Sequence, residues 1–247
     1  MKAVILAAGL SKRLRPLTDT TPKCLLDIHG KNFLHRALDN LLACGIREYI
    51  MVLGYRYEMI EKYIAENFPH LNVKFLYNHD YAENNNSYSL WMTKEIAGSE
   101  ILLLDSDILF EKEIVTALLD SPHGTCLALK RHALDEEQIK VIADGDGKVI
   151  EISKEAALDE AIGESIGIEK MSGKFLNDVF EILDRKILNE KNVNEFYEKT
   201  FEEVIAKNDS EKIMYCVDVS EYWCMEIDTA EDYENAKTNL IINQKVN

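Results

Sequence analysis

The chain has few of the features that mark secreted, membrane-spanning or disulfide-bonded proteins. Its 247 residues include five cysteines and four prolines. No two cysteines have CxxC spacing, which argues against a disulfide framework and against a zinc site. No apolar run approaches the length that spans a membrane. The first two residues lead directly into an apolar run, which leaves no room for a signal peptide. We therefore expect a cytoplasmic protein with reduced thiols.

Positive charge is also scarce. The chain carries 44 acidic and 28 basic side chains, for a formal net charge of −16. Such a surface should repel nucleic acid and anionic membranes, so we expect neither as a partner. Any polyanion must bind in a local basic pocket. Because 47% of the residues are hydrophobic and nothing in the sequence resembles a linker, we expect residues 1–247 to form a single domain.

Strand and helix patterns alternate along the first half of the chain. Short apolar runs typical of buried strands alternate with segments whose apolar residues recur at helical spacing. This alternation predicts an α/β fold in which helices cover both faces of a mostly parallel sheet. The expected strands are residues 3–6, 49–53, 73–78 and 101–104, and the expected helices are residues 32–44, 57–68 and 87–96.

The second half of the chain is less regular. Two short strands, at 139–143 and 149–152, flank a probable turn of Asp and Gly residues at 144–147, which together predict a hairpin. The helical patterns that follow predict helices at 173–188, 193–206 and 230–240. The last residues, 243–247, are expected to fray.

The most informative stretch is AVILAAGLSKRLRPLTDTTPK at 3–23. A buried strand ends there in small residues, so that backbone N–H groups can approach an anion closely. Arg13, Arg15 and Lys23 supply the positive charge that a polyphosphate requires. We interpret the stretch as a triphosphate-binding loop. A tight strand-to-helix turn with solvated basic residues is the alternative, and it would be preferred for a lone AAG.

The motif is longer than such a turn. The letters LAAG, followed by RL, PLT and PK, closely resemble the signature of the nucleotidyltransferases that activate sugar phosphates and phosphocholine. The resemblance implies a Rossmann-like, GT-A-type fold of three layers with a mixed, mostly parallel sheet. One position departs from the family, which usually has a second glycine where this chain has Ser11. Serine lacks the free access of glycine to positive φ, so we expect a slightly different loop path.

The resemblance also implies a reaction. An acceptor phosphate oxygen would attack the nucleotide α-phosphorus in line and expel pyrophosphate, with no need for a strong general base. Catalysis would come from positioning and charge stabilisation. Arg13 would bridge the β- and γ-phosphates, and Lys23 would lie near the α-phosphate and the incoming phosphate. Lys154 resembles a later lysine that family members direct at the reacting phosphates, although an isolated lysine is usually a solvated surface residue.

Two carboxylates are candidate Mg²⁺ ligands, because this hard cation prefers one or two carboxylates with phosphate oxygens and water. Asp107 follows an expected strand, and Asp228 lies in WCMEIDT before the last helix. The family binds its metal through acidic residues at these two places, although here the tryptophan is displaced upstream. Spacing alone does not show that the two residues meet. Asp228 could instead cap the helix, unless Thr229 does so. Asp105 and Glu226 could orient the ligands.

The segment NHDYAENNNSYSL at 78–90 carries the prediction of base specificity. Successive asparagines suit a loop whose amides read a base edge. The pattern N-x-x-Y-A-x-x-N-N-x-Y-S-L closely resembles the phosphocholine cytidylyltransferase branch, which makes CTP the preferred donor. An asparagine-rich turn with Ser87 capping the next helix is the alternative. The candidate nucleotide-binding residues are Leu6, Ala7, Ala8, Gly9, Asn78, Asn85, Asn86, Ser87 and Ser89.

The acceptor is less well defined. An aromatic box could hold a quaternary ammonium through cation–π contacts, although aromatics in such patterns are more often core. Glu164 or Glu226 could equally bind a primary amine or sugar hydroxyls. The segment 163–168 resembles the strand that lines the acceptor side in related enzymes. The aromatic candidates are Trp91, Tyr215, Tyr222 and Trp223.

The sequence therefore predicts a cytidylyltransferase that uses CTP and Mg²⁺ to transfer CMP to phosphocholine or a similar small phosphorylated alcohol or amine. A homodimer is compatible with this reading. One alternative is a sugar-1-phosphate nucleotidylyltransferase that uses UTP or dTTP. A glycosyltransferase of related fold shares a DxD motif but does not usually carry the LAAG-to-lysine loop. A nucleotide-sensing module without turnover is disfavoured by the joint presence of Arg13, Lys23, Asp107 and Asp228.

Overall fold

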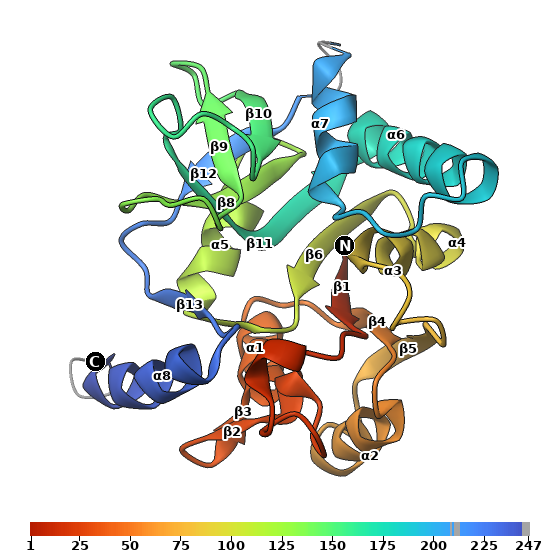
Figure 1. Cartoon of the computed structure of the whole chain (residues 1–247), viewed down its shortest axis with the longest axis vertical. Helices are drawn as coiled ribbons and strands as arrows, with labels where there is room; N and C mark the ends of the chain where they lie inside the picture. Colours follow the sequence, from red (N-terminus) through yellow and green to blue (C-terminus); the bar gives the residue numbers. More distant parts are fainter. Residues whose placement is uncertain (208, 210–212, 244–247) are drawn as a thin grey trace.

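Four parallel strands form one side of the main sheet in the computed structural model (Figure 1), which describes residues 1–207, 209 and 213–243. They lie in the order β6-β1-β4-β5, as the alternation of strands and helices predicted. The strands are β1 (Lys2–Ala7), β4 (Glu48–Leu53), β5 (Asn72–Tyr77) and β6 (Glu100–Asp105), and the helices between them are α1 (Phe33–Ala43), α2 (Tyr57–Asn67), α3 (Asn86–Met92) and α4 (Lys94–Ala97).

Antiparallel strands extend the sheet beyond β6. The long strand β11 pairs antiparallel with β6, β8 and β9, while β9 and β10 form the predicted hairpin. The sheet is therefore mixed, with its parallel part at the N-terminal half of the chain. The antiparallel strands are β8 (Cys126–Lys130), β9 (Lys140–Ala143), β10 (Val149–Ser153) and β11 (Gly163–Ser172), and a further strand, β12 (Tyr215–Asp218), pairs parallel with β8.

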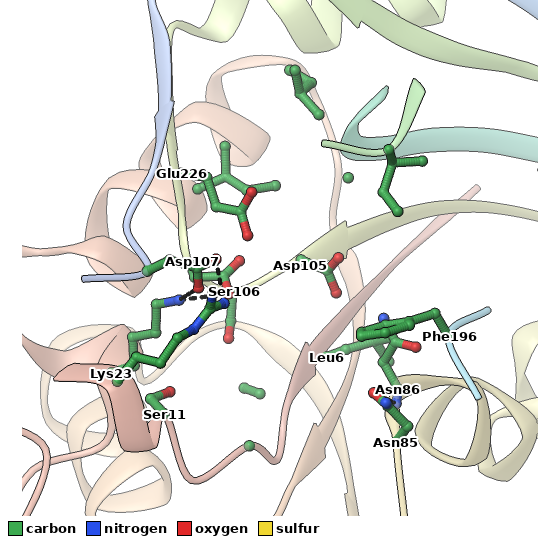
Figure 2. A pocket seen from close by; sticks show the side chains of 18 of the residues that line it. Leu6, Ser11, Lys23, Asn85, Asn86, Asp105, Ser106, Asp107, Phe196 and Glu226 are labelled. Atoms are coloured by element: carbon green, nitrogen blue, oxygen red, sulfur yellow. Dashed lines mark hydrogen bonds and ion pairs between the residues drawn. The ribbon is translucent and has the colours of Figure 1, made fainter. Parts of the chain in front are cut away.

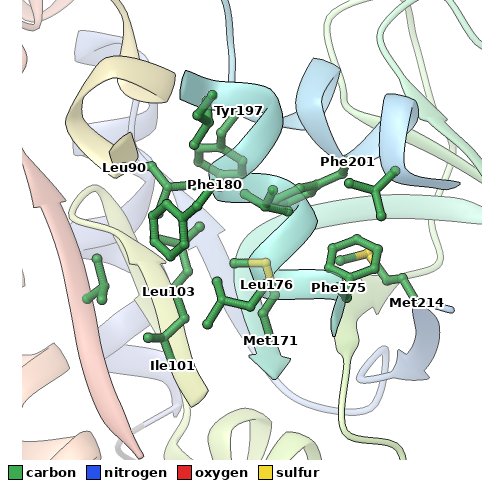
Figure 3. Packing of buried hydrophobic residues seen from close by; sticks show 14 of the residues in the cluster. Leu90, Ile101, Leu103, Met171, Phe175, Leu176, Phe180, Tyr197, Phe201 and Met214 are labelled. Atoms are coloured by element: carbon green, nitrogen blue, oxygen red, sulfur yellow. The ribbon is translucent and has the colours of Figure 1, made fainter. Parts of the chain in front are cut away.

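Helices cover both faces of the sheet. Successive residues of a strand point to opposite faces, so each central strand contributes side chains to two separate buried clusters. Val4 and Leu6 pack into one buried cluster, part of which Figure 3 shows, whereas Ala3 and Ile5 pack into another. The predicted three-layer arrangement is confirmed. The first cluster includes residues of α3, α4, α6 (Gly173–Asp184), the π-helical turn Arg185–Asn189 and α7 (Glu198–Ala206), and the second includes residues of α1, α2 and α5 (Lys112–Asp120).

A third, smaller cluster joins the two ends of the chain. Leu14 from the start and Ile227 and Tyr233 from the end are buried together. Within the described residues, no helix is long and apolar enough to cross a membrane. The elements around this cluster are the 3₁₀ turns Lys12–Leu14 and Lys23–Leu25, the strand pairs β2 (Asp27–Ile28) with β3 (Lys31–Asn32) and β7 (Ile108–Phe110) with β13 (Cys224–Glu226), and α8 (Ala230–Asn243).

Two helix predictions need correction. The helix expected over 193–206 begins only at Glu198, because Val193 and Tyr197 are held by the asparagine segment: the Asn85 N–H donates to the Val193 carbonyl at 3.0 Å, and the Tyr197 N–H donates to Asn86 Oδ1 at 2.9 Å. The helix expected over 87–96 is divided into α3 and α4. The fraying expected at 243–247 falls on residues that, from 244 on, lie outside the described part of the chain.

Gly54, directly after β4, allows the LAAG loop to lie against this strand end. A Cβ at this position would lie 2.6 Å from the Ala8 carbonyl oxygen and 2.9 Å from Tyr81 Cβ. The Tyr55 N–H donates to the same Ala8 oxygen at 3.0 Å. The loop therefore has no room to accommodate a side chain here.

We predict that Gly54→Ala lowers the free energy of unfolding by about 1–3 kcal/mol, because the added methyl group overpacks this contact. Urea denaturation measures the change. Gly145→Ala in the β9–β10 turn is the matched control, since a Cβ there would meet no atom within 4 Å. Equal stability of the two variants would contradict the prediction.

Candidate active site

A cavity of about 920 Å³ lies at the carboxyl ends of β1 and β6 (Figure 2). These two strands are neighbours, with Leu6 paired to Asp105, so the residues that follow them meet at one edge of the sheet. Ligands of open α/β sheets bind at such an edge. The predicted site residues that line the cavity are Leu6, Ala7, Ala8, Gly9, Arg13, Lys23, Asn78, Asn85, Asn86, Ser89, Asp107, Lys154 and Asp228.

The pairing of β7 with β13 brings the two predicted metal ligands together. Glu226 is paired with Ile108, and the Ile227 N–H donates to the Asp107 carbonyl at 3.1 Å. Asp228 follows immediately and reaches the cavity beside Asp107. This long-range pairing supplies the proximity that sequence spacing left open.

Asp228 does not use its carboxylate to cap α8. The Thr229 hydroxyl oxygen accepts from the Asp232 N–H at 3.2 Å, and the Asp232 carboxylate accepts from the N–H groups of Asp228 (3.1 Å) and Thr229 (2.7 Å). Thr229 and Asp232 thus each accept from the other's backbone N–H at the start of α8, as in a capping box. The Asp228 carboxylate remains available to the cavity.

Lys23 joins the two carboxylates. Its ammonium lies 2.9 Å from Asp107 Oδ2 and 2.8 Å from Asp228 Oδ1, and only 8% of its side chain is exposed. Burial alone would lower the pKa of Lys23, but Asp107 and Asp228 outweigh that effect and hold the pKa above its ordinary value. Arg13 adds a second cation, with Nη2 2.5 Å from Asp228 Oδ2. Burial alone would raise the pKa of the Asp228 carboxyl, but the charges of Lys23 and Arg13 outweigh that effect and lower the pKa below its ordinary value.

The same carboxylates fit a divalent cation. Asp107, Glu226 and Asp228 each offer an oxygen, and the three oxygens lie within 4.8 Å of one another. Asp107 Oδ1 is buried and has no hydrogen-bond partner among the described residues. Hard carboxylate oxygens are the protein ligands that Mg²⁺ prefers. Glu226, which the sequence offered as a residue that orients the ligands or binds the acceptor, is a member of the cluster.

The LAAG loop corrects two expectations. Ser11 adopts a left-handed conformation, with φ 49° and ψ 51°, so the serine takes the positive φ that we expected it to avoid. The strain is about 1–2 kcal/mol, and the Thr18 hydroxyl, which donates to the Ser11 carbonyl at 2.9 Å, helps to hold this conformation. Arg15 does not line the cavity; it pairs with Asp19 at 3.3 Å.

Two amides of the asparagine segment hold the segment itself. Asn78 and Asn84 exchange side-chain hydrogen bonds of 2.8 and 3.0 Å, and the Asn78 amide also donates to the Ser89 hydroxyl at 3.1 Å. Asn78 is 2% exposed. This part of the segment is therefore a prearranged wall of the cavity, with most of its amide groups already satisfied.

Asn85 and Asn86 each accept a backbone hydrogen bond through the side-chain oxygen, and both also line the cavity. Asn85 Oδ1 accepts from the Asn86 N–H at 2.8 Å at the start of α3. Ser87 is 2% exposed and does not line the cavity. Ser87 therefore lies apart from the other predicted nucleotide-binding residues, and the alternative that it caps the helix is wrong, because Asn85 occupies that position.

Lys154 lines the cavity away from the paired carboxylates. Its ammonium lies 5.5 Å from the centroid of the Phe196 ring and 4.0 Å from a carboxylate oxygen of the exposed Glu137. Neither contact buries the ammonium, whose side chain is 39% exposed. The ammonium of Lys154 therefore remains accessible from the cavity.

The four aromatic candidates do not form a box around the cavity. None of them lines it. The Trp91 indole donates to Asp184 at 2.8 Å, and Tyr215 stacks on His123 with ring centroids 3.6 Å apart. Among the described residues, the aromatic side chains that line the cavity are Tyr81 and Phe196.

Sequence reasoning missed an acidic group beside the cavity. Asp105, Glu169 and Glu198 are gathered around Tyr197, whose hydroxyl donates to Asp105 Oδ2 at 2.9 Å. Burial raises the pKa of all three carboxyls, and their mutual repulsion raises those of Asp105 and Glu169 further. Glu169 interrupts a buried strand, which was a readable signal, whereas nothing in the sequence placed Glu198 in the cavity.

A loop of small residues and a pair of carboxylates thus line one cavity at the carboxyl edge of a sheet that helices cover on both faces, which is where open α/β sheets bind their ligands. A sequence model of the family described as nucleotidyl transferase matches residues 2–241, and the chain belongs to this family. It is therefore a nucleotidyltransferase.

Individual relatives agree with this assignment. The chain is 29% identical to a CTP:phosphoglutamine cytidylyltransferase of Campylobacter jejuni over 95% of this chain and 98% of the relative. It is 28% identical to a choline-phosphate cytidylyltransferase of Streptococcus pneumoniae over 97% and 98% of the two chains. A solved CTP:phosphocholine cytidylyltransferase of S. pneumoniae has the same fold, with a TM-score of 0.76, 24% identity and coverage of 97% and 98%.

We predict that the carboxylate cluster binds a divalent cation without nucleotide. Asp107→Asn and Asp228→Asn should each weaken Mn²⁺ binding at least about tenfold, since each removes a charged ligand of a hard cation. Water-proton relaxation with Mn²⁺ as the probe measures the affinity. Asp146→Asn in the exposed β9–β10 turn is the control. Affinity like that of the wild type in both cluster variants would exclude this metal site.

Proposed function

We propose that the protein transfers CMP from CTP to a small phosphorylated alcohol or amine, such as phosphocholine, and releases pyrophosphate. The observation that carries the proposal is that one cavity joins the LAAG loop, the asparagine segment and the Lys23–Asp107–Asp228 cluster. The relatives that act with CTP support the choice of nucleotide. Guanylyl- and uridylyltransferases of sugar phosphates are also among the relatives, so the base and the acceptor are the points to test.

The nucleotide would lie along the edge of the sheet. Its base would face the asparagine segment, where Asn85 and Asn86 line the cavity. Amide groups can both donate and accept, which suits the mixed edge of cytosine. Its triphosphate would lie over the backbone of the LAAG loop and toward Arg13 and Lys23. The chain's charge of −16 makes such a local basic region the place where a polyanion can bind.

The residues of the cavity account for the chemistry in terms of charge. Lys23 and Arg13 would stabilise the negative charge that develops on the phosphates, and Lys154 would meet the incoming phosphate from the opposite wall. A Mg²⁺ held by Asp107 and Asp228 would supply charge neutralisation at the triphosphate. The rigid placement of Lys23 between two carboxylates fixes the position of its ammonium in advance, which is the kind of positioning that accelerates a transfer reaction.

The direct test is pyrophosphate release with Mg²⁺, in which five nucleoside triphosphates are crossed with a panel of acceptors. We expect turnover with CTP and a phosphorylated alcohol or amine, because the asparagine segment is predicted to read cytosine. The panel includes phosphocholine, phosphoethanolamine, glycerol phosphate and common sugar 1-phosphates. Turnover confined to UTP or dTTP with a sugar 1-phosphate would instead support the sugar-nucleotide alternative.

Two substitutions test the proposed roles in turnover. Lys23→Ala and Asp107→Asn should each lower kcat by at least about a hundredfold, the usual cost of removing a group that stabilises transition-state charge. Lys12→Ala, which removes an exposed lysine of the same loop, is the control for Lys23. Asp146→Asn serves the same purpose for Asp107. Near-wild-type turnover of either site variant would remove that residue from the mechanism.

A further inference from the structure

Glu198 is a buried carboxylate on the wall of the cavity that the proposed mechanism does not use. It is the first residue of α7, is 8% exposed and lines the cavity together with Phe196 and Lys154. The segment that carries it is fixed in place, because the Tyr197 N–H donates to Asn86 and the Tyr197 hydroxyl to Asp105. Glu198 is thus presented to the cavity by a rigid support.

One oxygen of the Glu198 carboxylate, Oε2, lacks a hydrogen-bond partner among the described residues. The Lys154 ammonium lowers the pKa of Glu198 through its charge, and it also makes contacts of its own with Glu137 and Phe196. Burial raises the pKa of Glu198 to about 7. A buried carboxylate oxygen without a hydrogen bond carries an uncompensated desolvation cost. A ligand that donates a hydrogen bond to this oxygen would offset that cost and bind more tightly.

We propose that Glu198 is a specificity residue that accepts a hydrogen bond from a protonated primary amine on the acceptor phosphate. This inference rests on the proposed function and narrows it: the preferred acceptor is an aminoalkyl phosphate with N–H donors, rather than one that carries a quaternary ammonium.

The surroundings of Glu198 favour an ammonium over other donors. Glu198 Oε2 is buried and has no donor among the described residues, so an ammonium that donates to it would also compensate the charge of the ionised carboxylate, whereas a neutral ribose hydroxyl would leave that charge uncompensated. A quaternary ammonium has no N–H and is typically held by an aromatic cage. The described lining offers Tyr81 and Phe196, and the Lys154 ammonium already lies over the Phe196 ring.

The experiment compares three acceptors that differ at the nitrogen: phosphoethanolamine, phosphocholine and ethyl phosphate. For each, kcat/KM is measured at saturating CTP and Mg²⁺ with the wild type, Glu198→Gln and Glu202→Gln. Glu202 is the matched control, because it lies one turn further along α7, pairs with Lys199 at 3.1 Å and does not line the cavity.

We expect the wild type to prefer phosphoethanolamine over both other acceptors by at least about tenfold, the worth of a charge-assisted hydrogen bond. Glu198→Gln should lose this preference, while its kcat/KM with ethyl phosphate changes by less than about threefold. Glu202→Gln should keep the preference, and Glu198→Asp should restore part of it. Because ethyl phosphate reports the same active site without the amine, a general loss of structure would lower all three values together.

Three results would overturn the inference. The first is an equal loss with all three acceptors, which indicates a structural role. The second is a wild type that uses phosphocholine or ethyl phosphate as well as phosphoethanolamine. The third is a Glu198→Gln variant whose KM for CTP rises and which no longer distinguishes CTP from 2′-deoxy-CTP, which places Glu198 at the ribose.

Failure of the proposed function has a separate signature. If the wild type releases no pyrophosphate with CTP and any acceptor, the cytidylyltransferase proposal fails. Calorimetric binding of the same three phosphates then decides the role of Glu198. A preference for phosphoethanolamine that Glu198→Gln removes would support the role, and binding without that preference would overturn it.

Discussion

The buried ammonium of Lys23 is the interaction on which the site depends. It lies between Asp107 and Asp228, within 2.9 Å of each, and so ties together the start, the middle and the end of the chain. Each of these charges would be costly to bury alone, and the cost is offset only when all three meet with good geometry. The cluster therefore forms only in a chain whose ends have already docked.

That docking is achieved by apolar contacts and backbone pairing rather than by the charges. Strand β13 pairs with β7 directly after Asp107, and Ile227 and Tyr233 pack with Leu14 beside the LAAG loop. The Tyr233 hydroxyl also donates to the Asp27 carbonyl at 2.5 Å. Hydrophobic burial of this kind is non-directional and strong enough to hold the end of the chain. The charged groups can then be placed for binding instead of for stability.

Local sequence patterns were sufficient for the parallel half of the sheet, because strand and helix periodicity acts over a few positions, but they did not predict the left-handed Ser11 in the loop after β1. They were insufficient where distant segments decide the outcome. The loop over 193–197 follows from hydrogen bonds to Asn85 and Asn86, and the role of Asn85 as helix cap displaces Ser87. The proximity of Asp228 to Asp107 depends on a β7–β13 pairing that spacing cannot reveal. Motif resemblance supplied that proximity as an expectation, and the structure supplies its cause.

If the proposed cation and polyphosphate bind in this cavity, its charge pairs would make their binding cooperative. Lys23 forms ion pairs with Asp107 and Asp228, and Arg13 forms one with Asp228. These are the same carboxylates that fit a divalent cation. A divalent cation at these oxygens would compete with the two basic side chains and would thereby release positive charge toward bound phosphates. By linkage, phosphates that attract Lys23 and Arg13 would release the carboxylates for the cation to the same extent. The paired charges neutralise one another within the site, which limits the cost of burying them, and the site would become strongly basic only with both ligands bound.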